Sequence, residues 1–167
     1  VTYDGLPTII KLDMLTREKN MPLHLHEFIN ELKQKYTMEL VHTYCKPRFY
    51  HEYALSRLKS EGYMLGCASN SIKESIEVML LKSNLIKYMD VIYSAQDVLK
   101  PKPDPDIYIK AISTLGMTPE ECLVIEDNEN GIKAAKDSGA HVMVVKEVSE
   151  VNFINIKQKI DQINKKL

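Results

Sequence analysis

The chain has 167 residues, of which 44% are hydrophobic and 27% are charged, and this composition is typical of a globular protein with one core of ordinary size. Its formal net charge of −1 comes from 22 basic and 23 acidic side chains that are mixed along the chain, which argues against binding to nucleic acid or to a membrane surface. No apolar stretch approaches the roughly 20 residues of a membrane-spanning helix and nothing at the start resembles a signal peptide, so we expect a cytoplasmic protein.

The N-terminal part of the chain predicts helices and no strand. Apolar residues recur at helical spacing across residues 28–41, and an earlier group at residues 9–15 predicts a helix of its own. Residues 45–50, which include a proline and two basic side chains, are typical of a connection between two units. We therefore predict a helical unit at residues 1–47 and an α/β unit at residues 48–167.

Strands alternate with helices in the second unit. Alternation of this kind predicts βαβ units, a parallel sheet and right-handed crossovers. The strands have the continuous apolar character of strands that are buried on both faces. We expect them at residues 62–68, 91–94, 122–126 and 142–145.

Several residues mark the ends of the predicted helices. Ser71 and Glu74 have the spacing of a capping box, and Pro105 stands where a further helix would begin. Gly116 and Gly139 stand where helices would end. Apolar residues at alternating spacings of three and four across residues 153–167 predict a final helix against the sheet, with a coiled-coil partner as the alternative.

The cysteines and histidines indicate no metal site. Cys45, Cys67 and Cys122 lie far apart without a C-x-x-C spacing, which argues against both zinc and a disulfide framework. We expect reduced thiols, two of them in the core. The five histidines form no H-E-x-x-H motif, and we expect all of them at the surface.

Polar residues follow three of the predicted strands. In an open parallel sheet, ligands bind beyond the carboxyl ends of the strands, where helix N-termini present free N–H groups. The first strand delivers Ser69 and Asn70 to that edge, a later one leads to Lys102 between two prolines, and another ends in Glu126 and Asp127. Hydroxyl donors, an ammonium and two carboxylates together complement a phosphoryl group with its Mg²⁺.

Each residue type suits one part of such a site. Mg²⁺ prefers hard oxygen ligands and keeps several waters. We therefore predict that Asp127 binds the ion directly, and that Glu126 either binds it through a water or accepts hydrogen bonds from the groups that surround it. The Lys102 ammonium offsets charge on phosphoryl oxygens and on a carboxylate nucleophile. Ser69 and Asn70 are predicted to bind substrate with Lys102, and the Ser69 hydroxyl is placed to hold a phosphoryl oxygen as charge develops.

Structural alternatives exist for each of these residues. Ser69 could belong to a helix cap, Lys102 could lie in a solvated loop, and Glu126 with Asp127 could cap the following helix and interact with its dipole. The three groups nevertheless occur in order, each after a predicted strand. That coincidence favours the functional interpretation.

Three stretches resemble motifs of one known family. "CASNS", "KPKPDPDIY" and "IEDNENGIKAAKDSGA" are similar to the second, third and fourth motifs of the haloacid dehalogenase-like hydrolases, in the branch of β-phosphoglucomutases and sugar-phosphate phosphatases. The resemblance covers roughly residues 50–145. It implies a Rossmann-like three-layer α/β core with a parallel sheet and a partial helical cap, in which Ser69 binds phosphate, Lys102 is the motif lysine, and Glu126 and Asp127 bind Mg²⁺.

The resemblance also implies a cap that closes over the site and sets the choice of substrate, with residues 5–12 similar to its substrate-facing stretch. The chain departs from the family at two points. Asn128 replaces the serine that many relatives have after the acidic pair, but it can still donate and accept hydrogen bonds. The first motif, an apolar strand ending in D-x-D-G that supplies the nucleophile, is not found. Asp4 precedes Gly5 without such a strand, and we do not assign it that role.

In this family the first strand lies at the centre of the sheet. Its absence would leave two rows of backbone groups without partners, so we expect a gap there and interpret the sequence as part of a longer protein. The gap could be filled by the missing segment, by a strand from a second copy in a strand-swapped dimer, or by a rearranged N-terminus. We expect the chain alone to bind Mg²⁺ weakly and to be inactive, whereas the parent protein acts through an aspartyl-phosphate on a small phosphorylated metabolite.

Other functions remain open at this level. A non-catalytic α/β module for binding or assembly is the main alternative, because the nucleophile is not found. A response-regulator receiver is disfavoured by the helical cap and by the late position of the acids, and a dinucleotide-binding protein by the lack of G-x-G-x-x-G. The sequence does not choose between phosphatase and mutase, and it identifies neither the phosphate ester nor the oligomeric state.

Overall fold

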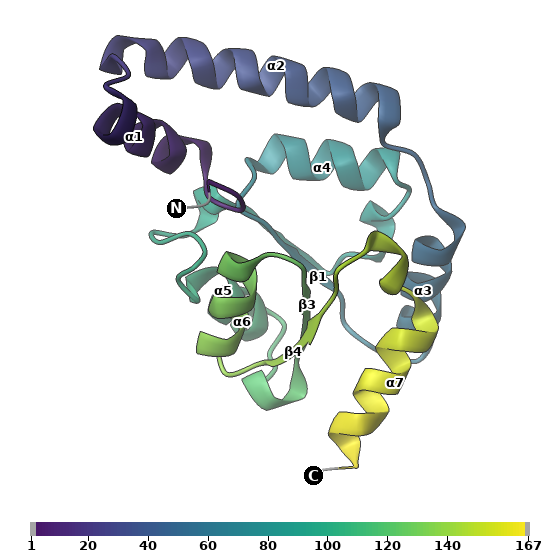
Figure 1. The fold of residues 1–167 in the computed structure, drawn as a ribbon. Helices are drawn as coiled ribbons and strands as arrows, with labels where there is room; N and C mark the ends of the chain where they lie inside the picture. The colour runs from purple at the N-terminus through teal and green to yellow at the C-terminus, as the bar shows by residue number, and fades with distance from the viewer. Residues whose placement is uncertain (1–2, 166–167) are drawn as a thin grey trace.

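The computed structural model describes residues 3–165. Its N-terminal part is helical, as predicted, with helices α1 (Thr8–Lys19) and α2 (His26–Tyr44). These two helices lie at one end of the molecule, and α2 runs alongside α4 (Lys73–Lys82) (Figure 1). The helical part therefore packs against the α/β part over its strand-to-helix loops.

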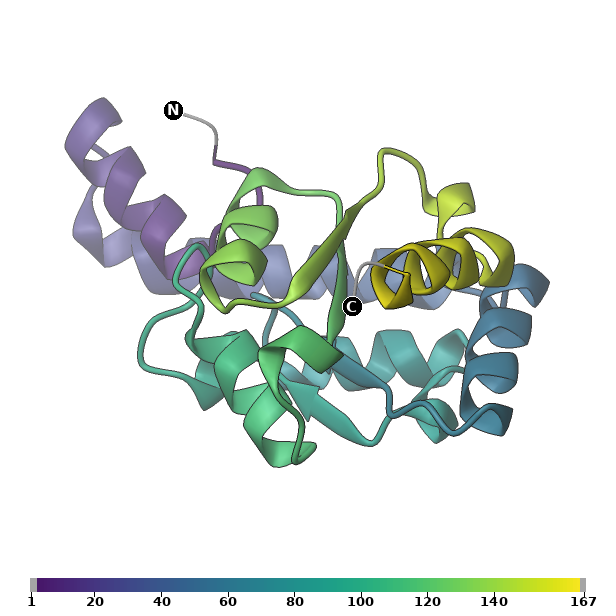
Figure 2. The same ribbon diagram turned by 90° about the horizontal axis from the view of Figure 1, so that it is seen from below.

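The α/β part has short parallel strands with helices on both sides. Helix α3 (Phe49–Ser60) precedes the first strand. Helix α7 (Phe153–Asn164), at the C-terminal end of the chain, lies beside α3 (Figures 1 and 2). The predicted alternation of strands and helices is confirmed. The remaining elements are β1 (Gly66–Ala68), β2 (Val91–Tyr93), α5 (Asp106–Thr114), β3 (Leu123–Glu126), α6 (Glu129–Asp137) and β4 (His141–Val144).

Two hydrophobic clusters show that the strands form a middle layer. Successive side chains of a strand point to opposite faces. Val124 packs with Ile107 and other buried residues of α5 and α6, whereas Leu123 and Ile125 pack with Ile156 of α7 and with residues of α3. The chain therefore has the three-layer α/β architecture that the sequence predicts.

The strands form two separate pairs. β1 pairs with β2, with Cys67 opposite Ile92, and β3 pairs with β4, with Ile125 opposite Met143; both pairs are parallel. Among residues 3–165, no strand joins β1 to β3. The sheet is thus interrupted where the sequence leads us to expect a gap.

An apolar cavity of about 600 Å³ lies at this interruption. We call it the central groove, and it is lined by residues of β1 and β3, by α5 and by α7. The Nε2 atom of His141, a residue that also lines the groove, is buried without a hydrogen-bond partner. The prediction that every histidine lies at the surface is therefore wrong for His141.

Three local predictions need correction. The first strand begins at Gly66 rather than at Gly62, which adopts a positive φ of 87° in the turn before it. Ser71 does not cap α4: the N-cap is Ile72, and the backbone N–H of Lys73 donates to Gln96 Oε1 (2.9 Å). The three cysteines are free, but each is only partly buried, so the expected pair in the core is absent.

The helix after the predicted connection begins at Phe49, close to the proposed unit boundary at residue 47. The division of the chain into two units at that point stays a prediction. The ends marked by proline and glycine agree with the structure: Pro105 precedes α5, and Gly116 and Gly139 have φ of 70° and 85° just after α5 and α6. The predicted last residue, Leu167, lies outside the described residues.

A short turn beside the strand ends is held by an acidic side chain. Asp97 Oδ2 accepts hydrogen bonds from the hydroxyl (2.6 Å) and the backbone N–H (2.7 Å) of Ser94, which is fully buried. The Ser94 hydroxyl bond, followed by the backbone bond, holds the pKa of Asp97 below its ordinary value of 3.8. Protonation of Asp97 therefore costs more in the folded chain than in the unfolded chain.

We expect the free energy of unfolding to depend less on pH under acidic conditions in Asp97→Asn than in the unchanged protein. Because the folded pKa of Asp97 is lowered, its contribution is fully present above the unfolded pKa of 3.8 and is lost as the pH falls through the folded value. Urea denaturation at a series of pH values below about 5 measures this loss. The exposed Asp161→Asn is the control, and an unchanged slope in Asp97→Asn would contradict the assignment.

Candidate functional site

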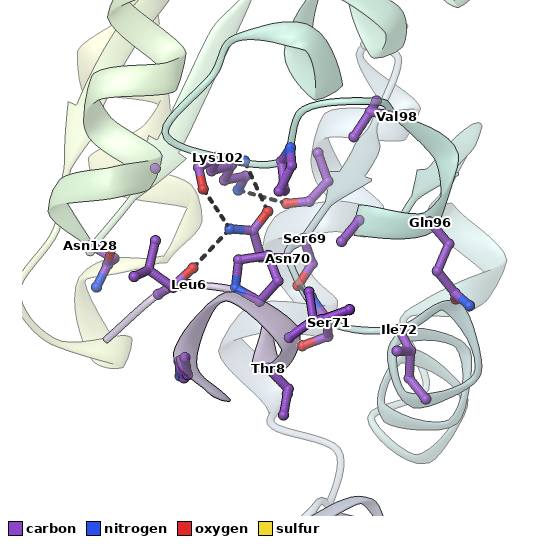
Figure 3. A pocket seen from close by; sticks show the side chains of 18 of the residues that line it. Leu6, Thr8, Ser69, Asn70, Ser71, Ile72, Gln96, Val98, Lys102 and Asn128 are labelled. Atoms are coloured by element: carbon purple, nitrogen blue, oxygen red, sulfur yellow. Dashed lines mark hydrogen bonds between the residues drawn. The ribbon is translucent and has the colours of Figure 1, made fainter. Parts of the chain in front are cut away.

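A second cavity, of about 640 Å³, lies at the carboxyl ends of the strands. We call it the strand-end cavity. It is lined by Ser69, Asn70, Lys102 and Glu126 from the α/β part, and by residues of α1 and α2 with the segment before them. Figure 3 shows the side chain of Asn70 between Lys102 and Leu6, with Ser69 close to Asn70. Four of the five predicted site residues therefore share one cavity.

Lys102 is the most deeply buried cation of this site. The residue is only 6% exposed, and its Nζ donates to the carbonyl oxygen of Ala68 (2.9 Å) and to Glu126 Oε1 (2.5 Å). It also lies 4.6 Å from the ring centroid of Tyr108. A buried ammonium requires partners of this kind, so the alternative of a solvated loop lysine is excluded.

Tyr108 is a part of the site that the sequence reasoning missed. Its hydroxyl donates to Glu126 Oε1, the same oxygen that accepts from Lys102. Burial, followed by the nearby Glu126 charge, raises the pKa of Tyr108 well above its ordinary value. Tyr108 ends the "KPKPDPDIY" stretch and lies on the apolar face of α5. A tyrosine on such a face suggests only a core residue.

Asn70 fixes the loop that carries Lys102. Its Oδ1 accepts from the backbone N–H of Lys102 (3.0 Å), and its Nδ2 donates to the Lys102 carbonyl (3.0 Å) and to the Gly5 carbonyl (2.8 Å). The dashed lines in Figure 3 mark bonds of this side chain. Asn70 therefore joins the β1 loop, the Lys102 loop and the N-terminal segment, and its amide is largely committed before any ligand binds.

Ser69 lies at the end of β1. Its backbone N–H donates to the Tyr93 carbonyl (3.0 Å), which extends the β1–β2 ladder, and its Oγ accepts from the backbone N–H of Ser71 (3.2 Å). Among residues 3–165, the Ser69 hydroxyl donates no hydrogen bond, so its proton remains able to bind a ligand. Ser69 is not the N-cap of α4, which is Ile72.

The two acids diverge at the end of β3. Glu126 is turned inward, with a side chain that is 12% exposed, whereas Asp127 is exposed and does not line the strand-end cavity. Glu126 is the last residue of β3, whereas Asp127 is the first residue of the loop that follows. Glu126 also packs closely against α6, where a Cβ atom at Gly131 would clash with its carboxyl group.

Asn128, rather than the acidic pair, caps the helix that follows. Its Oδ1 accepts from the backbone N–H of Asn130 (3.0 Å), and its Nδ2 donates to Asp4 Oδ2 (3.0 Å). The capping alternative for Glu126 and Asp127 is therefore not supported. The contacts of Asn128 and Asn130 with Asp4 also hold the N-terminal segment against the β3 loop.

Glu126 and Asp127 are residue types that suit a magnesium site. Two carboxylates supply hard oxygen donors, and Mg²⁺ commonly completes its coordination shell with waters and phosphate oxygens. Residues 3–165 contain no cluster of three or more His, Cys, Asp or Glu side chains able to hold a metal by themselves. The metal-binding roles of Glu126 and Asp127, like the phosphate-binding roles of Ser69, Asn70 and Lys102, stay predictions.

The fold and the site together define a three-layer α/β protein with a lysine, a carboxylate and a hydroxyl gathered at the strand ends under a helical cover. The family model of the haloacid dehalogenase-like hydrolases matches residues 8–145. The chain belongs to this family. No helix within residues 3–165 has the length and apolar character needed to cross a bilayer.

Individual relatives agree with this assignment. The chain is 27% identical over 134 residues to a pyrophosphatase, PpaX, of Bacillus cereus (72% of the chain, 61% of the relative), and 32% identical over 122 residues to a phosphoglycolate phosphatase of Aquifex aeolicus (73% and 57%). It thus spans less than two thirds of the length of these relatives. A crystal structure of β-phosphoglucomutase from Clostridium difficile shares its fold, with a TM-score of 0.78, 23% identity and coverage of 95% of this chain and 78% of that one.

Proposed function

We propose that this chain is the larger part of a cytoplasmic, Mg²⁺-dependent phosphatase or phosphomutase that acts on a small sugar phosphate or a similar metabolite. The observation that carries the proposal is the buried Lys102–Glu126 pair beside the Ser69 hydroxyl, at strand ends that face one cavity. Burial of an ion pair carries a cost in desolvation free energy, so its presence beside the cavity supports a role in ligand binding. A phosphoryl group is a ligand that needs both a cation and hydroxyl donors.

The proposed roles follow from the positions of the side chains. Lys102 offsets negative charge on the phosphoryl oxygens, and Ser69 donates its hydroxyl proton to one of them. Asn70 holds the Lys102 backbone in place. Asp127 and Glu126 hold Mg²⁺, which when bound neutralises charge on the phosphoryl group.

The nucleophile comes from outside these residues in this proposal. A carboxylate attacks phosphorus, a bond forms between that oxygen and phosphorus, and the bond from phosphorus to the ester oxygen breaks. Water then hydrolyses the acyl phosphate, or a second hydroxyl accepts the phosphoryl group. The central groove is the route by which an extended segment would bring such a carboxylate to the cavity, because the groove opens between the strand ends that carry Ser69 and Glu126.

The proposal is tested first with inorganic phosphate. We expect the 167-residue chain to bind phosphate weakly in the presence of Mg²⁺, as seen by ³¹P NMR line broadening, and Asp127→Ala to reduce the Mg²⁺ dependence of that binding. Asp161→Ala, which removes an exposed acid on α7, serves as the control. Phosphate binding that neither Asp127→Ala nor Lys102→Met affects would favour the non-catalytic module instead.

Turnover gives a separate test. We expect the purified chain to hydrolyse p-nitrophenyl phosphate no faster than buffer, since no nucleophile is assigned within it. Steady hydrolysis that Asp127→Ala abolishes would refute the proposed inactivity of the isolated chain while supporting the proposed chemistry.

A further inference from the structure

Two lysines of the helical part line the strand-end cavity opposite the predicted phosphate site. Lys11 comes from α1 and Lys33 from α2. Lys11 is partly buried and Lys33 lies at the more exposed rim. Within residues 3–165, neither side-chain ammonium takes part in an ion pair or a hydrogen bond, although several other lysines of the chain pair with acids.

The two ammonium groups are close enough to affect one another. Partial burial, followed by repulsion from Lys11, lowers the pKa of Lys33. Like charges that face one cavity without a counter-charge are destabilising, and a bound anion relieves both the repulsion and the partial loss of hydration. The lysines are thus complementary to an anionic group that this chain does not supply.

The size of the cavity is consistent with a ligand larger than one phosphate. Its volume of about 640 Å³ lies within the range of about 300–1,000 Å³ that is usual for small-molecule sites. Neutral polar side chains, Asn30 and Gln34 of α2, line it near Lys33. Lys102 lies on the α/β side of the same cavity, so one ligand can reach both the predicted phosphate site and the lysine pair.

We infer that Lys11 and Lys33 form a second anion subsite, and that the substrate of this enzyme carries a second anionic group in addition to the phosphoryl group that is transferred. This inference rests on the proposed function for the identity of the first group. The ligand class is a small phosphate ester with a carboxylate or a further phosphate at its other end.

Matched pairs of ligands test the subsite by isothermal titration calorimetry on the full 167-residue chain with Mg²⁺. The pairs are ethyl phosphate with 2-phosphoglycolate, glycerol 3-phosphate with 3-phosphoglycerate, and fructose 6-phosphate with fructose 1,6-bisphosphate. In each pair only the second member has the additional anion, as a carboxylate in the first two and as a phosphate in the third. We expect at least one second member to bind about tenfold or more tightly than its partner.

The double variant Lys11→Met/Lys33→Met is expected to remove this advantage, so that the second members bind no more tightly than the first members. Lys19→Met/Lys35→Met is the matched control, because these lysines are exposed on the same two helices and do not line the cavity. Equal binding within every pair, no binding by any second member, or an advantage that survives the double variant would overturn the inference.

The proposed function fails in a different way. If Lys102→Met leaves the binding of the first members unchanged, the phosphate site is wrongly assigned. An advantage of the second members that depends on Lys11 and Lys33 would still support the subsite in that case. Circular dichroism of each variant confirms that it is folded.

Discussion

Replacing Lys102 with methionine is expected to lower the free energy of unfolding by about 3 kcal/mol and to abolish phosphate binding. The side chains of Lys102 and Glu126 are 8% and 12% exposed. Removal of the cation therefore leaves a largely buried carboxylate with the Tyr108 hydroxyl as its remaining partner. Urea denaturation measures the change in stability, and calorimetry with inorganic phosphate measures the loss of binding.

The exposed pair on α6 provides the control for this variant. Lys133 pairs with Asp137 at i,i+4, and these side chains are 63% and 43% exposed, so Lys133→Met is expected to cost less than about 1 kcal/mol. Glu126→Gln keeps an acceptor for Tyr108 and for Lys102 while removing the charge. A cost for Lys102→Met no larger than that of Lys133→Met would contradict the account of a buried, stabilising pair.

An apolar strand joined ahead of residue 1 is expected to raise the free energy of unfolding by about 2 kcal/mol, since full burial of even one large apolar side chain contributes about this much. The N-terminal segment is already held against the loops that follow β1 and β3. The Gly5 carbonyl accepts from Asn70 after β1, and Asp4 accepts from Asn128 after β3. A strand of about five residues running parallel to β1 and β3 would end at that point.

Two measurements distinguish insertion of this strand from non-specific contact. Urea denaturation gives the change in stability, and hydrogen exchange shows whether the backbone amides of β1 and β3 that face the groove become protected. An extension of the same length with a proline at its centre is the control, because proline cannot complete the ladder. Equal exchange rates with and without the apolar extension would show that the groove does not take a strand.

The order of elements could be predicted from the sequence, but their contacts could not. Apolar runs and helix-ending glycines are local signals, and they located β3, α6 and the helix after Pro105. The short β1 was harder to delimit because Tyr63 and Leu65, although apolar and adjacent to it, pack as part of the connection from α3. Ser71 had the spacing of a capping residue, yet Gln96, which is distant in sequence, hydrogen-bonds the first turn of α4.

The site was predicted as a set of residue types rather than as a geometry. The rule that strand ends meet at one edge brought Ser69, Lys102 and Glu126 together correctly. It did not show that Glu126 points inward while Asp127 is exposed, because that depends on the face of β3 that Glu126 occupies and on the path of the loop that begins at Asp127. The lysines of α1 and α2 were also beyond reach, since their placement depends on how those helices pack over the loops.

The raised pKa of Tyr108 has a consequence for experiments on this protein. Because its pKa is raised, Tyr108 keeps its proton and goes on donating to Glu126 at pH values at which an ordinary tyrosine begins to ionise. The orientation of that carboxylate is therefore not expected to drift as solutions are made basic. Metal titrations carried out on the alkaline side can then test the proposed ion site without a release of Glu126 from its tyrosine.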